Sequence, residues 1–223
     1  MGHDRTMASA PGDVGGEPTT ARRLLDAAVA AIDEGGEPAV KVQDIVTQAG
    51  VAIPALYRHF GSREGLVQAA QADRLQRDLA NEISLITAAM EHVHDAASCR
   101  AVVTAALHRA TTDERTEPRW RRVNVIGSTY GRPELTEEVA AIQGRSMRAL
   151  REVMRRPHES GWFRPGLDLD AAAVWMAGQI VARFLQDLSL HDPAGPLAPA
   201  DAFDELWIST AIHLLFGDAP TGT

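Results

Sequence analysis

The strongest candidate for metal chemistry in this sequence is a Glu-x-x-His pair, Glu91 and His94. On a helix the two side chains would share one face, which is how helical bundles hold pairs of metal ions. Such a centre needs a second pair and further carboxylates, which the sequence does not supply, although Cys99 and His108 follow. The sequence therefore predicts neither a metal site nor a cofactor.

Catalytic signatures are equally scarce. Ser, His and Asp residues occur, but a Gly-x-Ser-x-Gly turn, a phosphate-binding loop and a dinucleotide-binding fingerprint do not. The chain is therefore not expected to be an enzyme; an all-α enzyme remains an alternative that metal analysis of the purified protein would test. The basic run Arg119, Arg121 and Arg122 is interpreted as a solvated helix face rather than an anion site.

The elements that would position functional residues are helical. Apolar residues recur at three- and four-residue spacing along most of the chain, which predicts an all-α fold. Helices are expected at about 20–35, 42–49, 53–60, 63–90, 98–112, 116–130, 133–156, 169–190 and 200–216. The first should bury a stripe of Leu25, Ala28, Val29 and Ile32. Residues 1–19, rich in Gly, Pro and small polar residues, and residues 218–223 are expected to be disordered tails.

Composition limits the partners of the chain. Its 223 residues carry 22 basic and 30 acidic groups, a net charge of −8, and Lys41 is the only lysine. An acidic surface repels nucleic acid, so a nucleic-acid site has to be a local patch. Cys99 is the only cysteine, and the sequence lacks both a signal-peptide core and an apolar run of about 20 residues. These features predict a cytoplasmic protein without a membrane partner.

The segment VQDIVTQAGVAIPALYRHFGSREGL, residues 42–66, joins a helix of about two turns to a second helix through Gly50. Glycine permits the positive φ that such a turn can require. In this arrangement one helix crosses the DNA backbone while the next enters a major groove about 12 Å wide. A small core is expected to hold the pair against the preceding helix: Ile45, Ala49, Val51, Leu56 and Phe60 with Leu25, Ala28 and Ile32.

This segment resembles the helix-turn-helix of the tetracycline-repressor (TetR) family of transcriptional regulators. The resemblance rests on several positions together: Ile45, Ala49-Gly50-Val51, Leu56-Tyr57, His59-Phe60, Arg63 and Leu66. It covers about residues 20–70, and beyond them only the helical layout and length agree. It implies a three-helix DNA-binding domain over 20–66 and a helical ligand-binding and dimerisation domain over 67–217.

The resemblance also implies which side chains contact DNA. Gln43, Ile53, Pro54 and Ala55 stand where family members reach base edges, whereas Tyr57, His59 and Arg63 stand where they touch phosphates. The chemistry agrees, because an amide can pair with adenine and apolar groups can contact the thymine methyl group. Lys41 is a further candidate for a phosphate contact. The alternatives are structural: Tyr57 and His59 as caps of the small core, and Ile53 as a residue that packs on its own helix.

Three features depart from the family pattern, one of which is Val46 at a position where a small Ala is usual. The other two concern DNA affinity. Lys41 and Ala52 occupy helix-cap positions where Ser or Thr is common, a change worth about 1 kcal/mol of helix stability at each position. Residues 20–75 carry six basic and seven acidic side chains, so this part of the chain is not basic. Both features favour an alternative, a helical ligand-sequestering or partner-binding protein with weakened DNA affinity.

The remaining helices are expected to bind a ligand and a second subunit. The predicted dimer interface is formed by Val174, Gly178, Val181, Leu185, Phe203, Trp207 and Leu214. The predicted pocket is lined by Met90, His94, Trp120, Asn124, Tyr130, Met147, Met154, Trp175 and Gln179, and suits an amphipathic or aromatic small molecule. Ordinary core packing is the alternative for both sets. The sequence as a whole predicts a homodimeric, ligand-responsive transcriptional repressor that binds a near-palindromic operator in double-stranded DNA.

Overall fold

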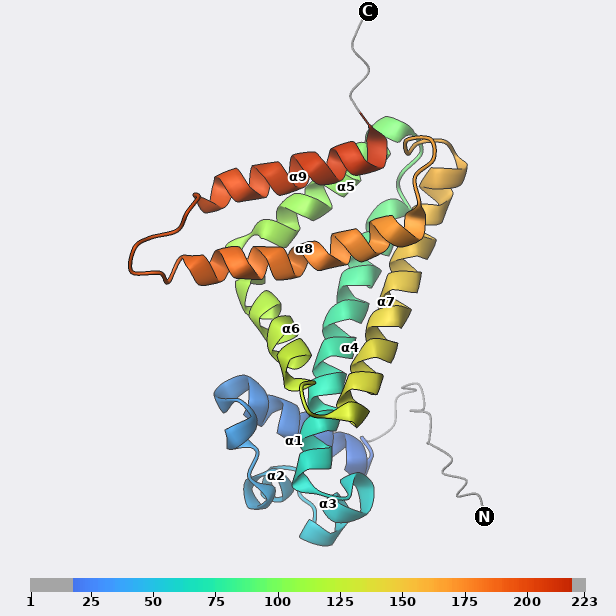
Figure 1. Cartoon of the computed structure of the whole chain (residues 1–223). Helices are drawn as coiled ribbons and strands as arrows, with labels where there is room; N and C mark the ends of the chain where they lie inside the picture. The colour runs from blue at the N-terminus through green and yellow to red at the C-terminus, as the bar shows by residue number, and fades with distance from the viewer. Residues whose placement is uncertain (1–17, 218–223) are drawn as a thin grey trace, which may run out of the picture. The chain divides into compact units, whose positions relative to one another are not determined.

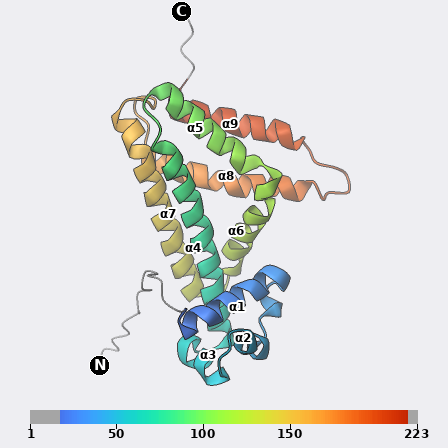
Figure 2. The same cartoon turned by 180° about the vertical axis from the view of Figure 1, so that it is seen from behind.

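The structure is a computed structural model that describes residues 18–217, so most of the expected N-terminal tail and the whole C-terminal tail lie outside it. Within the described range the chain forms nine α-helices, two 3₁₀ helices and no strand (Figures 1 and 2). The all-α prediction is confirmed. The helices are α1 Thr20–Gly35, α2 Val42–Gln48, α3 Ile53–Phe60, α4 Arg63–Met90, α5 Ala96–Thr111, α6 Thr116–Ser128, α7 Pro133–Glu159, α8 Leu169–Ser189 and α9 Ala200–Phe216. The 3₁₀ helices are η1 Glu37–Ala39 and η2 Asp113–Arg115.

Helix ends follow local capping chemistry. Helix α5 begins two residues before the expected start, because the Asp95 carboxylate accepts the Ser98 backbone N–H at 2.7 Å in a capping box. Helix α7 continues past the expected end at 156 and includes Pro157 in its last turn. The pair Glu91 and His94 lies beyond the end of α4, so it does not share a helix face.

The chain divides into two compact units between Ala70 and Gln71. The first unit holds α1, η1, α2, α3 and the start of α4, and the second holds the rest of α4 and α5 to α9. The sequence-based boundary between residues 66 and 67 lies four residues earlier in the same helix.

The first unit packs around Leu24, Ala28, Ile45, Leu56 and Leu66, each at most 1% exposed. The buried face of α1 differs from the expected stripe. Leu24 and Ala27 are buried beside Ala28 and Ile32, while Leu25 and Val29 are half-buried at the edge. Two apolar stripes overlap on α1, and α2 and α3 cover the one centred on Ala28.

The second unit contains three apolar clusters. The first joins Leu75 and Leu79 of α4 to Val125, Leu135, Val139 and Ile142. The second contains Cys99, Met154 and Phe163, and the third packs Trp207 of α9 against Leu107 of α5. Helices α8 and α9 lie side by side in both views, with α5 packed against α9.

Candidate DNA-binding surface and ligand cavity

The turn between α2 and α3 depends on Gly50. Its φ is 63°, the left-handed region that favours glycine. The N–H of Val51 donates to the carbonyl of Val46 at 2.9 Å, and the N–H of Gly50 donates to that of Thr47 at 3.1 Å. These two bonds form a Schellman motif, which ends α2 and satisfies its last carbonyls. The positive φ expected from the sequence is therefore present.

Helix α3 buries one face and exposes the other. Leu56 is fully buried in the core of the first unit, whereas Ile53 is 38% and Tyr57 48% exposed. Pro54 and His59 are exposed and Ala55 is half-buried. The exposed face of α3 therefore carries most of the side chains that were expected to contact DNA.

Helix α2 presents two further candidates. Lys41, its N-cap residue, and Gln43, in its first turn, are both exposed. Neither Lys41 nor Ala52, the N-cap residue of α3, caps its helix with a side-chain hydrogen bond. Pro54 in the first turn of α3 lacks an N–H, so one donor fewer needs a cap there.

Arg63 is already engaged within the first unit. Its Nε donates to the Val40 carbonyl at 2.7 Å, and its Nη2 donates to the Glu37 carbonyl at 2.6 Å. The half-buried side chain thus holds the segment around η1 against the start of α4. The Nη1 group makes neither of these bonds. Arg63 therefore has a structural role in the first unit, which the sequence analysis did not predict.

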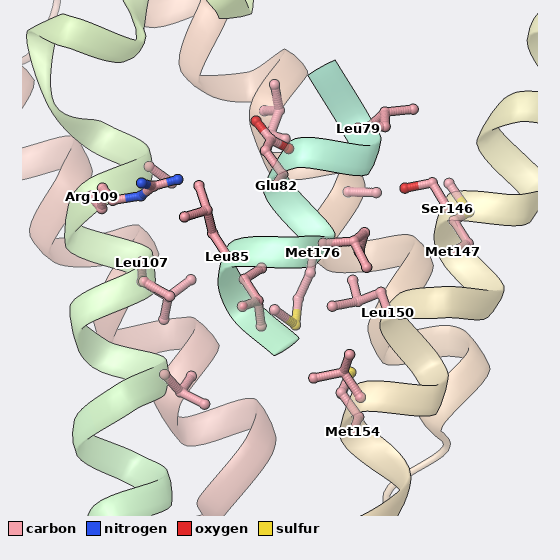
Figure 3. A pocket seen from close by; sticks show the side chains of 18 of the residues that line it. Leu79, Glu82, Leu85, Leu107, Arg109, Ser146, Met147, Leu150, Met154 and Met176 are labelled. Atoms are coloured by element: carbon pink, nitrogen blue, oxygen red, sulfur yellow. The ribbon is translucent and has the colours of Figure 1, made fainter. Parts of the chain in front are cut away.

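The second unit holds a cavity of about 660 Å³ lined by residues of all six of its helices, α4 to α9. This volume lies within the usual range for small-molecule sites. Figure 3 shows Leu79 of α4, Leu107 of α5, Met147, Leu150 and Met154 of α7, and Met176 of α8 around it. The lining is predominantly aliphatic.

Three of the residues expected in the pocket, Met90, Met147 and Met154, line this cavity. The other six, His94, Trp120, Asn124, Tyr130, Trp175 and Gln179, do not. Trp120 packs edge-on against Phe184 with ring centroids 4.8 Å apart, and Tyr130 is 95% exposed. Polar and aromatic residue types therefore did not identify the lining of this cavity. The apolar stripe of α4, which includes Ile83 and Ile86, was the better indication of it.

The expected solvated basic face on α6 is wrong for two of its three arginines. Arg119 is 4% and Arg122 7% exposed, and both line the cavity. Arg122 Nη2 lies 2.6 Å from Glu82 Oε2, and Arg115 pairs with the other oxygen of the same carboxylate. Burial lowers the pKa of Arg122 to about 10, a shift that the nearby Asp78 carboxylate opposes. Arg121 points elsewhere and donates to Glu117 at 2.7 Å.

A second buried ion network joins α6 to α8 and α9. Arg119 donates through Nε and Nη2 to the two carboxylate oxygens of Asp187, at 2.8 and 3.2 Å. Arg183 pairs with the same carboxylate and, through Nε at 2.7 Å, with Asp204. The side chains of Arg119, Arg183 and Asp187 are each at most 6% exposed. These charges require one another, because an unpaired buried ion is costly.

Residues 24–70 match the family model described as bacterial regulatory proteins of the tetR family. This match places residues 24–70 in the TetR family. The chain is 34% identical over 88 residues to the HTH-type transcriptional regulator BetI 2 of Chromohalobacter salexigens, a match that covers 40% of each protein. Less than half of that curated relative is therefore matched.

Solved structures of transcriptional regulators share the fold over most of the chain. One from Mesorhizobium loti MAFF303099 is 15% identical, covers 87% of this chain and 94% of its own, and has a TM-score of 0.63. A Saccharomonospora viridis regulator in complex with choline is 18% identical, covers 87% of this chain and 96% of its own, and has a TM-score of 0.60. Bacillus subtilis FadR in complex with stearoyl-CoA is 18% identical, covers 88% of this chain and 98% of its own, and has a TM-score of 0.56.

In the second unit, α8 and α9 expose an apolar stripe. On α8 the stripe contains Val174, Val181, Leu185 and Leu188, between 39% and 58% exposed, with the exposed Gly178 among them. On α9, Leu206 is 67% exposed and Phe203 and Leu214 are half-buried. Trp207, in contrast, is 6% exposed and packs inside the unit, which leaves little of its surface for a partner. Val174, Gly178 and Val181 also line the cavity.

Other chemistries find little support between residues 18 and 217. In that range no group of three or more His, Cys, Asp or Glu side chains is arranged to hold a metal ion. No helix in the described part of the chain is both long and apolar enough to span a bilayer.

Proposed function

We propose that this TetR-family regulator is a homodimeric repressor that binds a near-palindromic operator and is released by a small molecule in its cavity. The observation that carries the proposal is the exposed face of α3, where Ile53 and Tyr57 lie in solvent opposite the buried Leu56. In helix-turn-helix proteins, a helix that follows such a turn and exposes one face enters the major groove, and α3 follows the turn at Gly50.

The side chains divide by what they can read. The Gln43 amide offers a donor and an acceptor that match adenine, and Ile53, Pro54 and Ala55 offer apolar surface to a thymine methyl group. Tyr57 Oη, the imidazole of His59, the ammonium group of Lys41 and the free Nη1 of Arg63 are donors suited to phosphates. Base readout would thus be largely apolar, and the phosphate contacts would fix the register.

The proposal includes a dimer because a single copy of residues 20–75, with seven acidic and six basic side chains, has little general attraction for DNA. The exposed stripe on α8 and α9 offers a self-complementary surface for two copies. Two recognition helices would then meet successive major grooves roughly 34–36 Å apart. Joint binding raises affinity without any new contact in either half.

Release by a ligand follows from the cavity in the second unit. If the ligand favours a conformation that binds operator poorly, the coupling is reciprocal, and operator weakens ligand binding by the same factor. The fold alone does not select the ligand, since related structures hold molecules as unlike as stearoyl-CoA and choline.

The test is selection of random duplex DNA by the full chain, followed by fluorescence anisotropy of the enriched duplex at two salt concentrations. We expect an inverted repeat and a steep loss of affinity with salt. Tyr57→Phe should weaken binding to all sequences alike, whereas Gln43→Ala should change the preferred bases. Gln48→Ala, an exposed glutamine on the same helix, is the matched control. A uniform loss from Gln43→Ala would remove that residue from base readout.

The ligand-sequestering alternative rests on the two helices without side-chain caps, α2 and α3. It predicts ligand binding by a folded chain that enriches no DNA sequence at low salt. That outcome would replace the repressor proposal.

A further inference from the structure

We infer that the ligand of the cavity is an unbranched aliphatic molecule with one anionic head group. The inference rests on the proposed function in one respect, that the cavity is an effector site. Its chemical class follows from the side chains that surround the cavity.

The body of the ligand is set by an aliphatic wall. Leu, Ile, Val, Ala and Met side chains from α4, α5, α7 and α8 form most of it, and Phe163 and Trp207 are the only aromatic residues among its described lining. Met147, Met154 and Met176 add flexible, polarisable surface that adapts to a chain of methylene groups. A planar aromatic ligand would find few faces on which to stack.

The head group is set by an excess of positive charge. Arg109, Arg115, Arg119 and Arg122 line the cavity, and Glu82 is the single carboxylate among its described lining. Asp187 neutralises Arg119 from outside the lining. Glu82 is shared between Arg115 and Arg122, and the nearby Asp78, which does not line the cavity, pairs with Arg121 at 3.6 Å. The polar part of the cavity therefore favours an anion.

Two donors are ready for that anion. Arg109 is exposed, and no acidic side chain among residues 18–217 pairs with it; Figure 3 shows it extending from α5 toward Leu85. The Nε of Arg122 is buried and has no protein acceptor in the described chain. A buried donor without an acceptor is destabilising, and an anionic oxygen would supply the missing acceptor.

A cationic ligand fits poorly for the same reasons. Recognition of a quaternary ammonium group uses several aromatic faces or free carboxylates. Here Glu82 is already held by two arginines, and a cation would meet four guanidinium groups.

The arrangement predicts competition between the ligand and Glu82. A head group that binds Arg115 and Arg122 takes guanidinium groups that otherwise hold the α4 carboxylate. Removal of that carboxylate charge should therefore tighten anion binding, which is the opposite of what loss of a direct contact would do.

The experiment titrates the full chain by calorimetry with four probes below their critical micelle concentrations: decanoate, decyl phosphate, decan-1-ol and decyltrimethylammonium. We expect both anions to bind at least about tenfold tighter than the alcohol, the range of a charge-assisted hydrogen bond. The tighter of the two anions identifies the head group as carboxylate or phosphate. Equal affinity for the alcohol, or tighter binding of the ammonium compound, would overturn the inference.

Variants locate the site. Arg109→Gln, at an exposed position that leaves the fold intact, should weaken decanoate about fivefold and leave decan-1-ol unchanged. Glu82→Gln should tighten decanoate binding. Met147→Trp should weaken the binding of all four probes, because the larger side chain takes up part of the cavity. Arg121→Gln on α6, outside the lining, is the matched control and should change nothing. Unchanged decanoate binding by both Arg109→Gln and Met147→Trp would place the molecule elsewhere and refute the assignment.

Operator affinity, measured on the same preparations, separates this inference from the proposed function. Decanoate that binds through Arg109 without releasing operator would leave the ligand class standing and refute release by ligand. A chain that binds operator but neither anion would leave the repressor proposal standing and refute the ligand class.

Discussion

Replacement of Asp187 by Ala should strongly destabilise the second unit. Its carboxylate is the shared partner of Arg119 and Arg183, and all three side chains are at most 6% exposed. Loss of one partner of a buried ion pair costs about 3–5 kcal/mol, because the remaining charge is left in a poor solvent. Arg183 keeps Asp204, and Arg119 keeps the carbonyls of Ala110 and Thr112. We therefore expect a value near the lower end, about 3 kcal/mol.

The assay is urea unfolding followed by circular dichroism at one protein concentration, because association also stabilises a folded chain. The control is Glu159→Ala, which removes the partner of Arg155 from a pair that is 50% and 60% exposed. Exposed pairs contribute about 0–1 kcal/mol, so this variant should unfold almost as the parent does. A loss below about 1 kcal/mol for Asp187→Ala would refute the buried network as a source of stability.

Three further outcomes follow from particular side chains. Gly65→Ala should destabilise the first unit by about 1–3 kcal/mol, since an added Cβ would lie 2.2 Å from the Phe60 carbonyl oxygen. Gly127→Ala, with open space around the added Cβ, should be neutral or stabilising. Thermal melts that rank the two variants the other way would contradict this. Leu185→Asp should convert the proposed dimer to a monomer in light scattering. Leu197→Asp, in the exposed loop before α9, should leave it dimeric. If both variants remain dimeric, the α8 stripe is not the interface. Burial raises the pKa of the Cys99 thiol to about 11, so its thiolate is scarce at pH 8; a thiol reagent should modify native protein far more slowly than urea-unfolded protein, and equal rates would show that Cys99 is accessible.

The sequence was most informative where function depends on local chain geometry. The bounds of α3, the positive φ at Gly50 and the exposed positions of Gln43 and Tyr57 all follow from short-range spacing. Local pattern could not tell which of two overlapping stripes on α1 is buried, because that depends on where α2 and α3 pack. The second role of Arg63 was equally hidden, since its acceptors lie more than 20 residues away in the chain.

The cavity was harder to predict because six helices form it. Tyr130 was expected to line it, but it lies in the turn between α6 and α7 and is 95% exposed, and Trp120 packs against Phe184 instead. Arg119 and Arg122 were predicted to lie on a solvated face because their partners are distant in the sequence. Asp187 is 68 residues from Arg119, and Glu82 is 40 residues from Arg122. Periodicity identifies a buried face without revealing whether that face meets another helix or an empty space.

The exposed Lys41 at the start of α2 is the only lysine in the chain. Amine-directed chemistry therefore addresses one side chain besides the α-amino group. A dye coupled there would sit at the proposed DNA surface and report occupancy directly. By the same logic, acylation of a single amine would remove a positive charge from that surface, so one modification could adjust how long the regulator stays on DNA.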